Sequence, residues 1–167
     1  ALVLPSTCTS IGNLGGYRAT PTSLTLPEGL LSIGALAFYY GAIGGASTAI
    51  TFPNSLTGIG NAAFGRCGGF RTITVPNGAI GSTAFYFTSL RTGTLGTGVT
   101  SVGNSCFAYS SLERLNCNIP LTSIGTNAFM YTSSNLVIHA RASDSTWTAG
   151  TNLSIKGNSS VDVIKDL

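Results

Sequence analysis

Few residues in this chain could carry out chemistry, and they are not grouped as a catalytic centre requires. There is one histidine, His139, and there are five acidic residues among 167. A catalytic triad needs a histidine beside a nucleophile and a carboxylate, and glycoside hydrolysis needs two cooperating carboxylates. The acids are not paired within the repeat units described below, and nothing resembles a glycine-rich phosphate loop. We therefore expect that the protein is not an enzyme.

The four cysteines, Cys8, Cys67, Cys106 and Cys117, are the other reactive groups. They lack the C-x-x-C spacing and the histidine partners of zinc sites, so we expect no metal site and no cofactor. Cys8, Cys106 and Cys117 fall where other repeat units carry small or aliphatic residues. We expect free thiols that pack as small hydrophobic groups.

Two sets of side chains at repeating positions could bind a ligand rather than react with one. The first is a row of outward strand positions, which begins at Val3 and ends at Val137 and otherwise contains Thr25, Thr51, Thr74, Thr94 and Asn116. Such a row could contact a partner along a sheet, or order water as ice-binding solenoids do. Threonine also favours exposed strand positions whatever the function.

The second set lies two positions after a recurring phenylalanine and consists of Tyr40, Arg66, Phe87, Tyr109 and Tyr131. If successive units stack in register, these residues form an aromatic strip that could stack on sugar rings or pack against a partner. The same strip could instead only shield the edge of the molecule. A column of Arg71, Arg91 and Glu113 is expected to be a solvated rim, with a weak anion site as the alternative.

Composition narrows the class of partner. The net charge of +3 comes from eight scattered basic and five acidic residues, which is unlike the clustered basic face of a nucleic-acid-binding protein. No apolar run approaches the roughly 20 residues that span a bilayer, so we expect no membrane insertion. Only 8% of residues are charged, and the surface is rich in Gly, Ser, Thr and Asn. Such surfaces are common in secreted and surface-display proteins, so we expect an extracellular or cell-surface location.

These candidate residues are placed by an internal repeat of about 22 residues. A pair of Ile or Val followed by Gly recurs at intervals of 22, 26, 21, 22 and 22 residues, and a phenylalanine follows five positions after five of its six copies. The pairs begin at Ile11, Ile33, Ile59, Ile80, Val102 and Ile124. A unit this short cannot bury a core by itself, so the repetition predicts a solenoid in which neighbouring coils share one interior.

Each unit also contains an alternating apolar segment, such as LTLP, ITFP or ITVP, which predicts a strand that ends at proline. The Ile-Gly pair is expected to turn the chain, with Gly allowing a left-handed or closely approached backbone. The segments 61–64 and 126–129 are interpreted as short helical turns that direct Phe64 and Phe129 inward. The predicted fold is a right-handed β/α solenoid of six to seven repeats, with a parallel sheet on one face and short helical turns on the other.

The segments LPEGLLSIGALAF, FPNSLTGIGNAAFGRCGGFRTITVP and TSVGNSCFAYSSLERL resemble the BspA-like leucine-rich repeats. That pattern is approximately a strand ending in Pro, then x-x-Val-x-x-Ile-Gly-x-x-Ala-Phe-x-x-Cys-x-x-Leu, and the resemblance extends from residue 1 to about residue 138. It implies a leucine-rich-repeat solenoid in which Cys67 is a core position. It also implies a secreted or cell-surface protein that mediates adhesion and protein contacts, with no catalytic residues to assign.

Two domains and two functions are expected from these observations. Residues 1–138 form the solenoid, and residues 139–167, which leave the repeat, cap its last coil. The first function is an extracellular interaction or adhesion module for a protein or glycan ligand. The alternative is a structural subunit that packs head-to-tail in a surface layer, fibre or virion appendage, forming a homo-oligomer or filament through an uncapped N-terminal coil.

Overall fold

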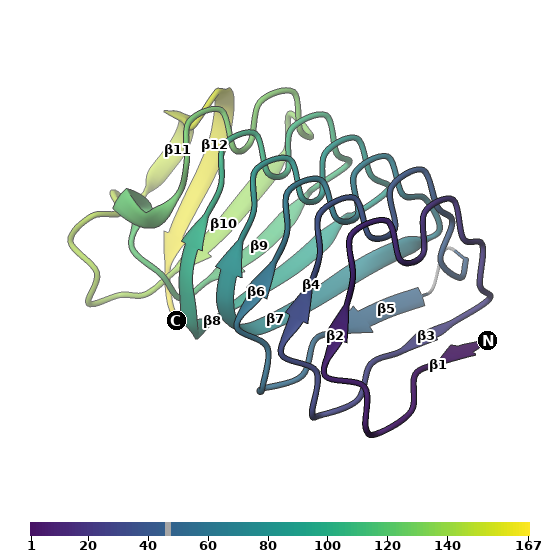
Figure 1. Cartoon of the computed structure of the whole chain (residues 1–167). Helices are drawn as coiled ribbons and strands as arrows, with labels where there is room; N and C mark the ends of the chain where they lie inside the picture. Colours follow the sequence, from purple (N-terminus) through teal and green to yellow (C-terminus); the bar gives the residue numbers. More distant parts are fainter. Residues whose placement is uncertain (46–47) are drawn as a thin grey trace.

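The computed structural model describes residues 1–45 and 48–167, without the side chains of residues 151–154 and 159. The chain winds into a parallel β-solenoid of about seven turns, here called coils, with the N-terminus at one end of the stack (Figure 1). The repeat predicted from the Ile-Gly pairs is confirmed, because Ile11, Ile33 and Ile59 stand in one parallel register. The register continues through Ile80, Val102 and Ile124.

Each coil contributes strand residues to two strips of sheet. The first strip contains β1 (Leu2–Val3), β3 (Leu24–Thr25), β5 (Thr48–Thr51), β9 (Arg114–Cys117) and β10 (Leu136–Ala140). The second strip contains β2 (Ser10–Ile11), β4 (Ser32–Ile33) and β6 (Gly58–Ile59). Strands β7 (Phe70–Ile80) and β8 (Thr92–Val102) are long enough to run through both strips, so they join β5, β9 and β10 with β2, β4 and β6 in one sheet, while β1 and β3 form a separate two-stranded sheet.

The third side of each coil follows the Ile-Gly pair and is here called the turn edge. The sequence predicted short helical turns on this side, but the structure has no helix there within the described residues. Within the described residues the one helical segment is the 3-10 turn η1 (Leu121–Ser123). Along the first turn edge, alternate N–H groups donate to the next coil, for example Leu14 to Ala35 at 3.1 Å and Gly16 to Ala37 at 2.7 Å. The N–H groups between them close local turns. In an α-helix each N–H donates to the carbonyl four residues earlier. The N–H groups that bond to the next coil cannot do so, and the turn edge therefore does not form an α-helix.

The glycine of the Ile-Gly pair serves close approach rather than left-handed geometry. A Cβ on Gly81 would lie 2.7 Å from the backbone nitrogen of Asn61 in the preceding coil. None of these six glycines has a positive φ; instead, the left-handed positions are the second and sixth residues after each of them, such as Ala62 and Arg66 at φ 53° and 54°. Asparagine after the pair also joins coils, because Asn61 Oδ1 accepts a hydrogen bond from Ser82 N at 2.9 Å.

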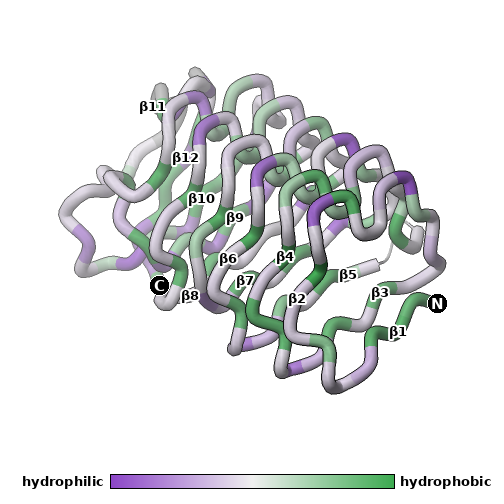
Figure 2. The backbone as a smooth tube through the Cα atoms, viewed as in Figure 1, coloured by the Kyte–Doolittle hydropathy of each residue, from purple (hydrophilic) through white to green (hydrophobic). Residues whose placement is uncertain are grey.

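One continuous core fills the space between the three sides, as the repeat predicts. The recurring phenylalanines are buried and stack ring on ring, with centroids of Phe64 and Phe85 at 5.5 Å and of Phe85 and Phe107 at 5.7 Å. The first coil has Gly16 in place of this residue, and the ring of Phe38 closes over it. Figure 2 shows hydrophobic residues recurring at equivalent places in successive coils.

The last residues continue the sheet. Strand β12 (Asn158–Lys165) pairs in parallel with β10, and β11 (Gly150–Ile155) pairs with β12 in antiparallel orientation. Trp147 is buried, and its Nε1 donates to the Ile119 carbonyl at 2.9 Å. The expected boundary after residue 138 falls inside β10. Among the described residues, no helix has the length and apolar character needed to cross a membrane.

Candidate interaction surfaces

The threonine row lies on the outward side of the first strip. Parallel pairing aligns Thr51 with Thr74, Thr74 with Thr94, and Thr94 with Asn116. Thr25 and Thr51 are exposed, whereas Thr74, Thr94 and Asn116 are half-buried. The structure thus brings Thr51, Thr74, Thr94 and Asn116 into one line, whereas Thr25 is paired with Val3 in the separate β1–β3 sheet. The short side chains of the row project little beyond the sheet.

The C-terminal end of the row differs from the sequence reading. Val137 pairs with Arg114, and His139 is the residue aligned with Asn116. The expected register was therefore displaced by two residues at this coil, which returns a side chain to the same face because strand residues alternate. Nδ1 of His139 lies 2.9 Å from Oδ2 of Asp166, while its Nε2 is buried without a partner among the described residues. The sequence analysis predicted neither His139 nor its partner Asp166 at this end of the row.

The Arg71, Arg91 and Glu113 column stacks as expected. The N–H of Arg91 donates to the Arg71 carbonyl at 2.8 Å, and the N–H of Glu113 donates to the Arg91 carbonyl at 2.9 Å. The Arg91 guanidinium pairs with Glu113 at 2.7 Å, and about half of each side chain is exposed. An exposed pair of this kind contributes at most about 1 kcal/mol and leaves little charge for a separate anion.

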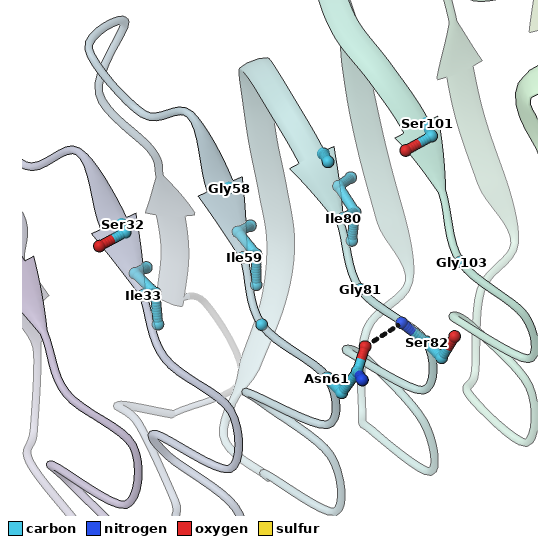
Figure 3. Close-up of a pocket in the computed structure, with 12 residues that line it drawn as sticks. Ser32, Ile33, Gly58, Ile59, Asn61, Ile80, Gly81, Ser82, Ser101 and Gly103 are labelled. Atoms are coloured by element: carbon cyan, nitrogen blue, oxygen red, sulfur yellow. Dashed lines mark hydrogen bonds between the residues drawn. The ribbon is translucent and has the colours of Figure 1, made fainter.

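A broad trough of about 440 Å³ lies on the second strip (Figure 3). It exists because Gly58 and Ala79 stand in register with Ser32 and Ser101, so two small residues lie between two hydroxyls. Its lining has no charged side chain. The trough therefore offers shape, a few hydroxyls and the amide of Asn61.

The turn edge carries most of the exposed large hydrophobic side chains of the solenoid. The sixth residue after each glycine of the Ile-Gly pairs occupies the same left-handed position, with φ between 53° and 58°. We call the following nine residues, which are these six and three aromatic neighbours, the aromatic ridge: Arg18, Tyr40, Arg66, Phe87, Tyr109 and Tyr131, with Tyr17, Tyr39 and Tyr86. Phe87 is 52% exposed and Tyr131 is 67% exposed.

The ridge is continuous because each side chain contacts the next. The Arg66 guanidinium lies 5.5 Å from the ring centroid of Tyr40 on one side and 5.0 Å from that of Phe87 on the other. The Phe87 and Tyr109 rings are 6.4 Å apart, and the Tyr109 and Tyr131 rings are 4.8 Å apart. Such cation–π and aromatic contacts hold exposed side chains in fixed positions.

Charge on the ridge has one sign. Arg18 contacts the rings of Tyr17 and Tyr40, and neither Arg18 nor Arg66 makes an ion pair within the described part of the chain. The six turn-edge segments that carry the ridge, from 12–19 to 125–132, contain no acidic residue. The guanidinium N–H donors thus remain available for a ligand.

Sequence reasoning identified five of the nine ridge residues and missed Tyr17, Arg18, Tyr39 and Tyr86. The prediction placed ridge residues two positions after the recurring phenylalanine. The first coil has Gly16 in place of that phenylalanine, so Arg18 was not identified. Counting from the Ile-Gly pair would have found it. The two tyrosines of later coils directly follow Phe38 and Phe85, and they join the ridge through ring contacts with Tyr40 and Phe87.

The cysteines belong to the core rather than to a site. Cys67, Cys106 and Cys117 are buried free thiols, and burial raises the pKa of each to about 12. The thiolate is the reactive form, so these groups are inert near neutral pH. Over residues 1–45 and 48–167, no cluster of three or more His, Cys, Asp and Glu residues could hold a metal ion.

Comparison with known proteins identifies the repeat. A family model described as BspA type Leucine rich repeat region matches residues 45–142, more than half of the chain, with six copies. No curated protein and no solved structure matches the chain at a significant level.

Proposed function

Because this chain belongs to the BspA type leucine rich repeat family, we propose that it is a non-catalytic extracellular or cell-surface module that binds a protein or glycan ligand. Repeats of this family suggest a protein-interaction module, and solenoids of this class are typically non-catalytic. The finer parts of the proposal are the adhesion role, the location and the binding surface. They are supported by the features of the ridge and by the low charge content of the surface.

The observation that carries the proposal is the aromatic ridge. Tyrosine and arginine are enriched among the residues that dominate binding energy at interfaces. On this edge they are exposed, contiguous and held in place by stacking, so little side-chain entropy remains to be lost on binding. The threonine row, with Thr25, Thr51, Thr74, Thr94 and Asn116, is a second contact surface of smaller expected contribution.

We also propose that residues 139–167 cap the solenoid. The buried Trp147 and the pairing of β12 with β10 support this role. Asp144 accepts hydrogen bonds from the N–H and the hydroxyl of Thr146, which lower the pKa of Asp144, and the Thr146 hydroxyl accepts one from Leu121 N at 2.8 Å. These hydrogen bonds connect the loop after β10 to η1.

The ridge is tested by probing arrays of glycans and of purified extracellular proteins with the labelled whole chain. We expect ligands whose binding falls about thirtyfold or more in a Tyr40→Ala/Phe87→Ala variant, as for interface residues worth 2 kcal/mol or more. The comparison variant is Thr25→Ala/Thr51→Ala, which removes two exposed side chains of the threonine row and should weaken binding less than the ridge variant does. Equal binding by wild type and the ridge variant would remove the ridge as the binding surface.

A structural subunit is the second candidate. The first coil exposes Val3 and Leu14, at 66% and 52%, and such apolar groups could pack against another molecule. Light scattering during size-exclusion chromatography of the isolated chain separates the two functions. Oligomers that grow with concentration and are lost in a Val3→Ser/Leu14→Ser variant would favour assembly, and a monomer at all concentrations would exclude it.

A further inference from the structure

A polar hollow of about 210 Å³ lies at the C-terminal end of the aromatic ridge. Tyr131, Thr132 and Ser134 line it from the last turn edge, and Gly157, Asn158 and Ser160 line it from the β11–β12 hairpin. The two segments are joined directly, because the N–H of Phe129 donates to the Lys156 carbonyl at 3.0 Å. The C-terminal segment, expected only to cap the solenoid, thus also builds a concave surface.

The hairpin that forms one part of the hollow has a defined backbone. Ile155 pairs with Asn158 across a two-residue turn in which Lys156 and Gly157 have φ values of 46° and 91°. Two positive φ values are typical of the tight turn that matches strand twist. A Cβ at Gly157 would lie 3.0 Å from Met130 Cβ, so glycine also allows the hairpin to approach the turn edge.

The polar groups of the hollow are held in place before any ligand arrives. Asn158 is 7% exposed, and its Nδ2 donates to Thr132 Oγ1 at 2.7 Å and to the Ser133 carbonyl at 3.1 Å. Its Oδ1 accepts from Ser160 N at 2.8 Å, and the Thr132 hydroxyl donates to the Phe129 carbonyl at 2.9 Å. The network fixes the backbone and side chains on which the remaining hydroxyls stand.

Two hydroxyls in the lining are free for a ligand. Those of Ser134 and Ser160 make no hydrogen bond with any described residue, and none of the six lining residues is charged. Beside them stands the Tyr131 side chain, 67% exposed and with its ring centroid 4.8 Å from that of Tyr109. An aromatic face next to uncharged donors and acceptors suits a molecule with apolar C–H faces and many hydroxyls.

We propose that this hollow binds one sugar ring of a neutral glycan, with the ring stacked on Tyr131 and its hydroxyls bonded to Ser134 and Ser160. This proposal rests on the proposed function and assigns it a ligand class, a neutral glycan, one end of which is bound in the hollow. The volume is below the roughly 300–1,000 Å³ of pockets that enclose drug-sized ligands, which matches a single ring. Further sugar units would lie along the ridge towards Tyr109 and Phe87.

The test is NMR of the isotopically labelled whole chain with glucose, galactose, mannose and N-acetylglucosamine at millimolar concentration, and with N-acetylneuraminate as the charged comparison. We expect at least one neutral sugar to shift the amide signals of residues 131–134 and 157–160. Tyr131→Ala should weaken its binding about tenfold, and Ser134→Ala/Ser160→Ala about threefold. Leu31→Ala, which removes an exposed side chain outside the ridge, the threonine row and the hollow, should leave the affinity unchanged.

Three results would overturn the inference: no shift with any neutral sugar, shifts that map elsewhere, or full affinity in Tyr131→Ala. Stronger binding of N-acetylneuraminate than of every neutral sugar would also contradict it. If the sugars fail while array ligands still depend on Tyr40 and Phe87, the hollow is rejected and the proposed function stands. If sugars bind in the hollow but no ligand depends on those two residues, the ridge-wide function is rejected instead.

Discussion

The turn edge and the first strip of sheet are built by the same coils, yet they present side chains in different ways. On the strip, Thr74 and Thr94 are half-buried neighbours in a regular parallel ladder. On the edge, Phe87 and Tyr109 are exposed and occupy left-handed positions, with the backbone bonded alternately to itself and to the next coil. The comparison shows that large exposed side chains are carried where hydrogen bonds to neighbouring coils, rather than residue preference, impose the backbone conformation.

The largest expected effect concerns the core behind the edge. Phe85→Ala removes the middle of the stacked phenyl column and should lower the free energy of unfolding by about 3–5 kcal/mol. Phe87→Ala, two residues away on the ridge, removes exposed contacts with Arg66 and Tyr109 and should lower it by only about 0.5–1 kcal/mol. Urea denaturation measures both. A Phe87→Ala cost close to that of Phe85→Ala would mean that the ridge is part of the core, and the comparison would fail.

A smaller effect is expected at the glycines that let coils approach. The added methyl of Gly81→Ala would meet the backbone of residues 60 and 61 and should cost about 1–3 kcal/mol, as overpacking does. Gly12→Ala is the matched control, since a Cβ at Gly12 meets nothing within 4 Å. Thermal and urea denaturation of the two variants compare them, and equal stabilities would show that coil spacing does not depend on these glycines.

The smallest effect has opposite signs in the two regions. Thr83 on the edge has φ 55°, which an L-residue adopts at a cost, so Thr83→Gly should raise the free energy of unfolding by about 0.5–1 kcal/mol. Thr74→Gly on the strip should lower it by about 1 kcal/mol, because glycine weakens a strand. The loss of the Thr83 hydroxyl bond to the Ser82 carbonyl is controlled by Thr83→Ala. The same sign in both glycine variants would contradict the contrast.

Much of the fold follows from residue spacing. The Ile-Gly pairs and the alternating apolar segments recur with the same spacing, which predicts stacked coils. The buried phenylalanines and the inward Ile or Val residues lie where that spacing places them. The turn edge was expected to be helical because left-handed residues such as Ala62, Leu36 and Thr83 carry no preference that marks them. Their conformation is imposed by hydrogen bonds to the next coil, and such bonds are invisible within one unit.

The candidate surfaces could be predicted only where their residues follow the spacing of the repeat. Tyr40, Phe87, Tyr109 and Tyr131 share a phase with the repeat, so their alignment could be anticipated. The hollow beside Tyr131 could not, because Asn158 and Ser160 lie outside the repeat and reach the turn edge only through the hairpin. The position of His139 in the threonine row was missed because the last unit departs from the earlier spacing.

Arginine, tyrosine and phenylalanine occupy the same backbone site in six successive coils, and φ there varies only from 53° to 58°. The backbone at this site therefore keeps one conformation beneath side chains of different size and charge. Substituting these residues one position at a time would therefore change the exposed surface of the turn edge while the solenoid beneath keeps its shape.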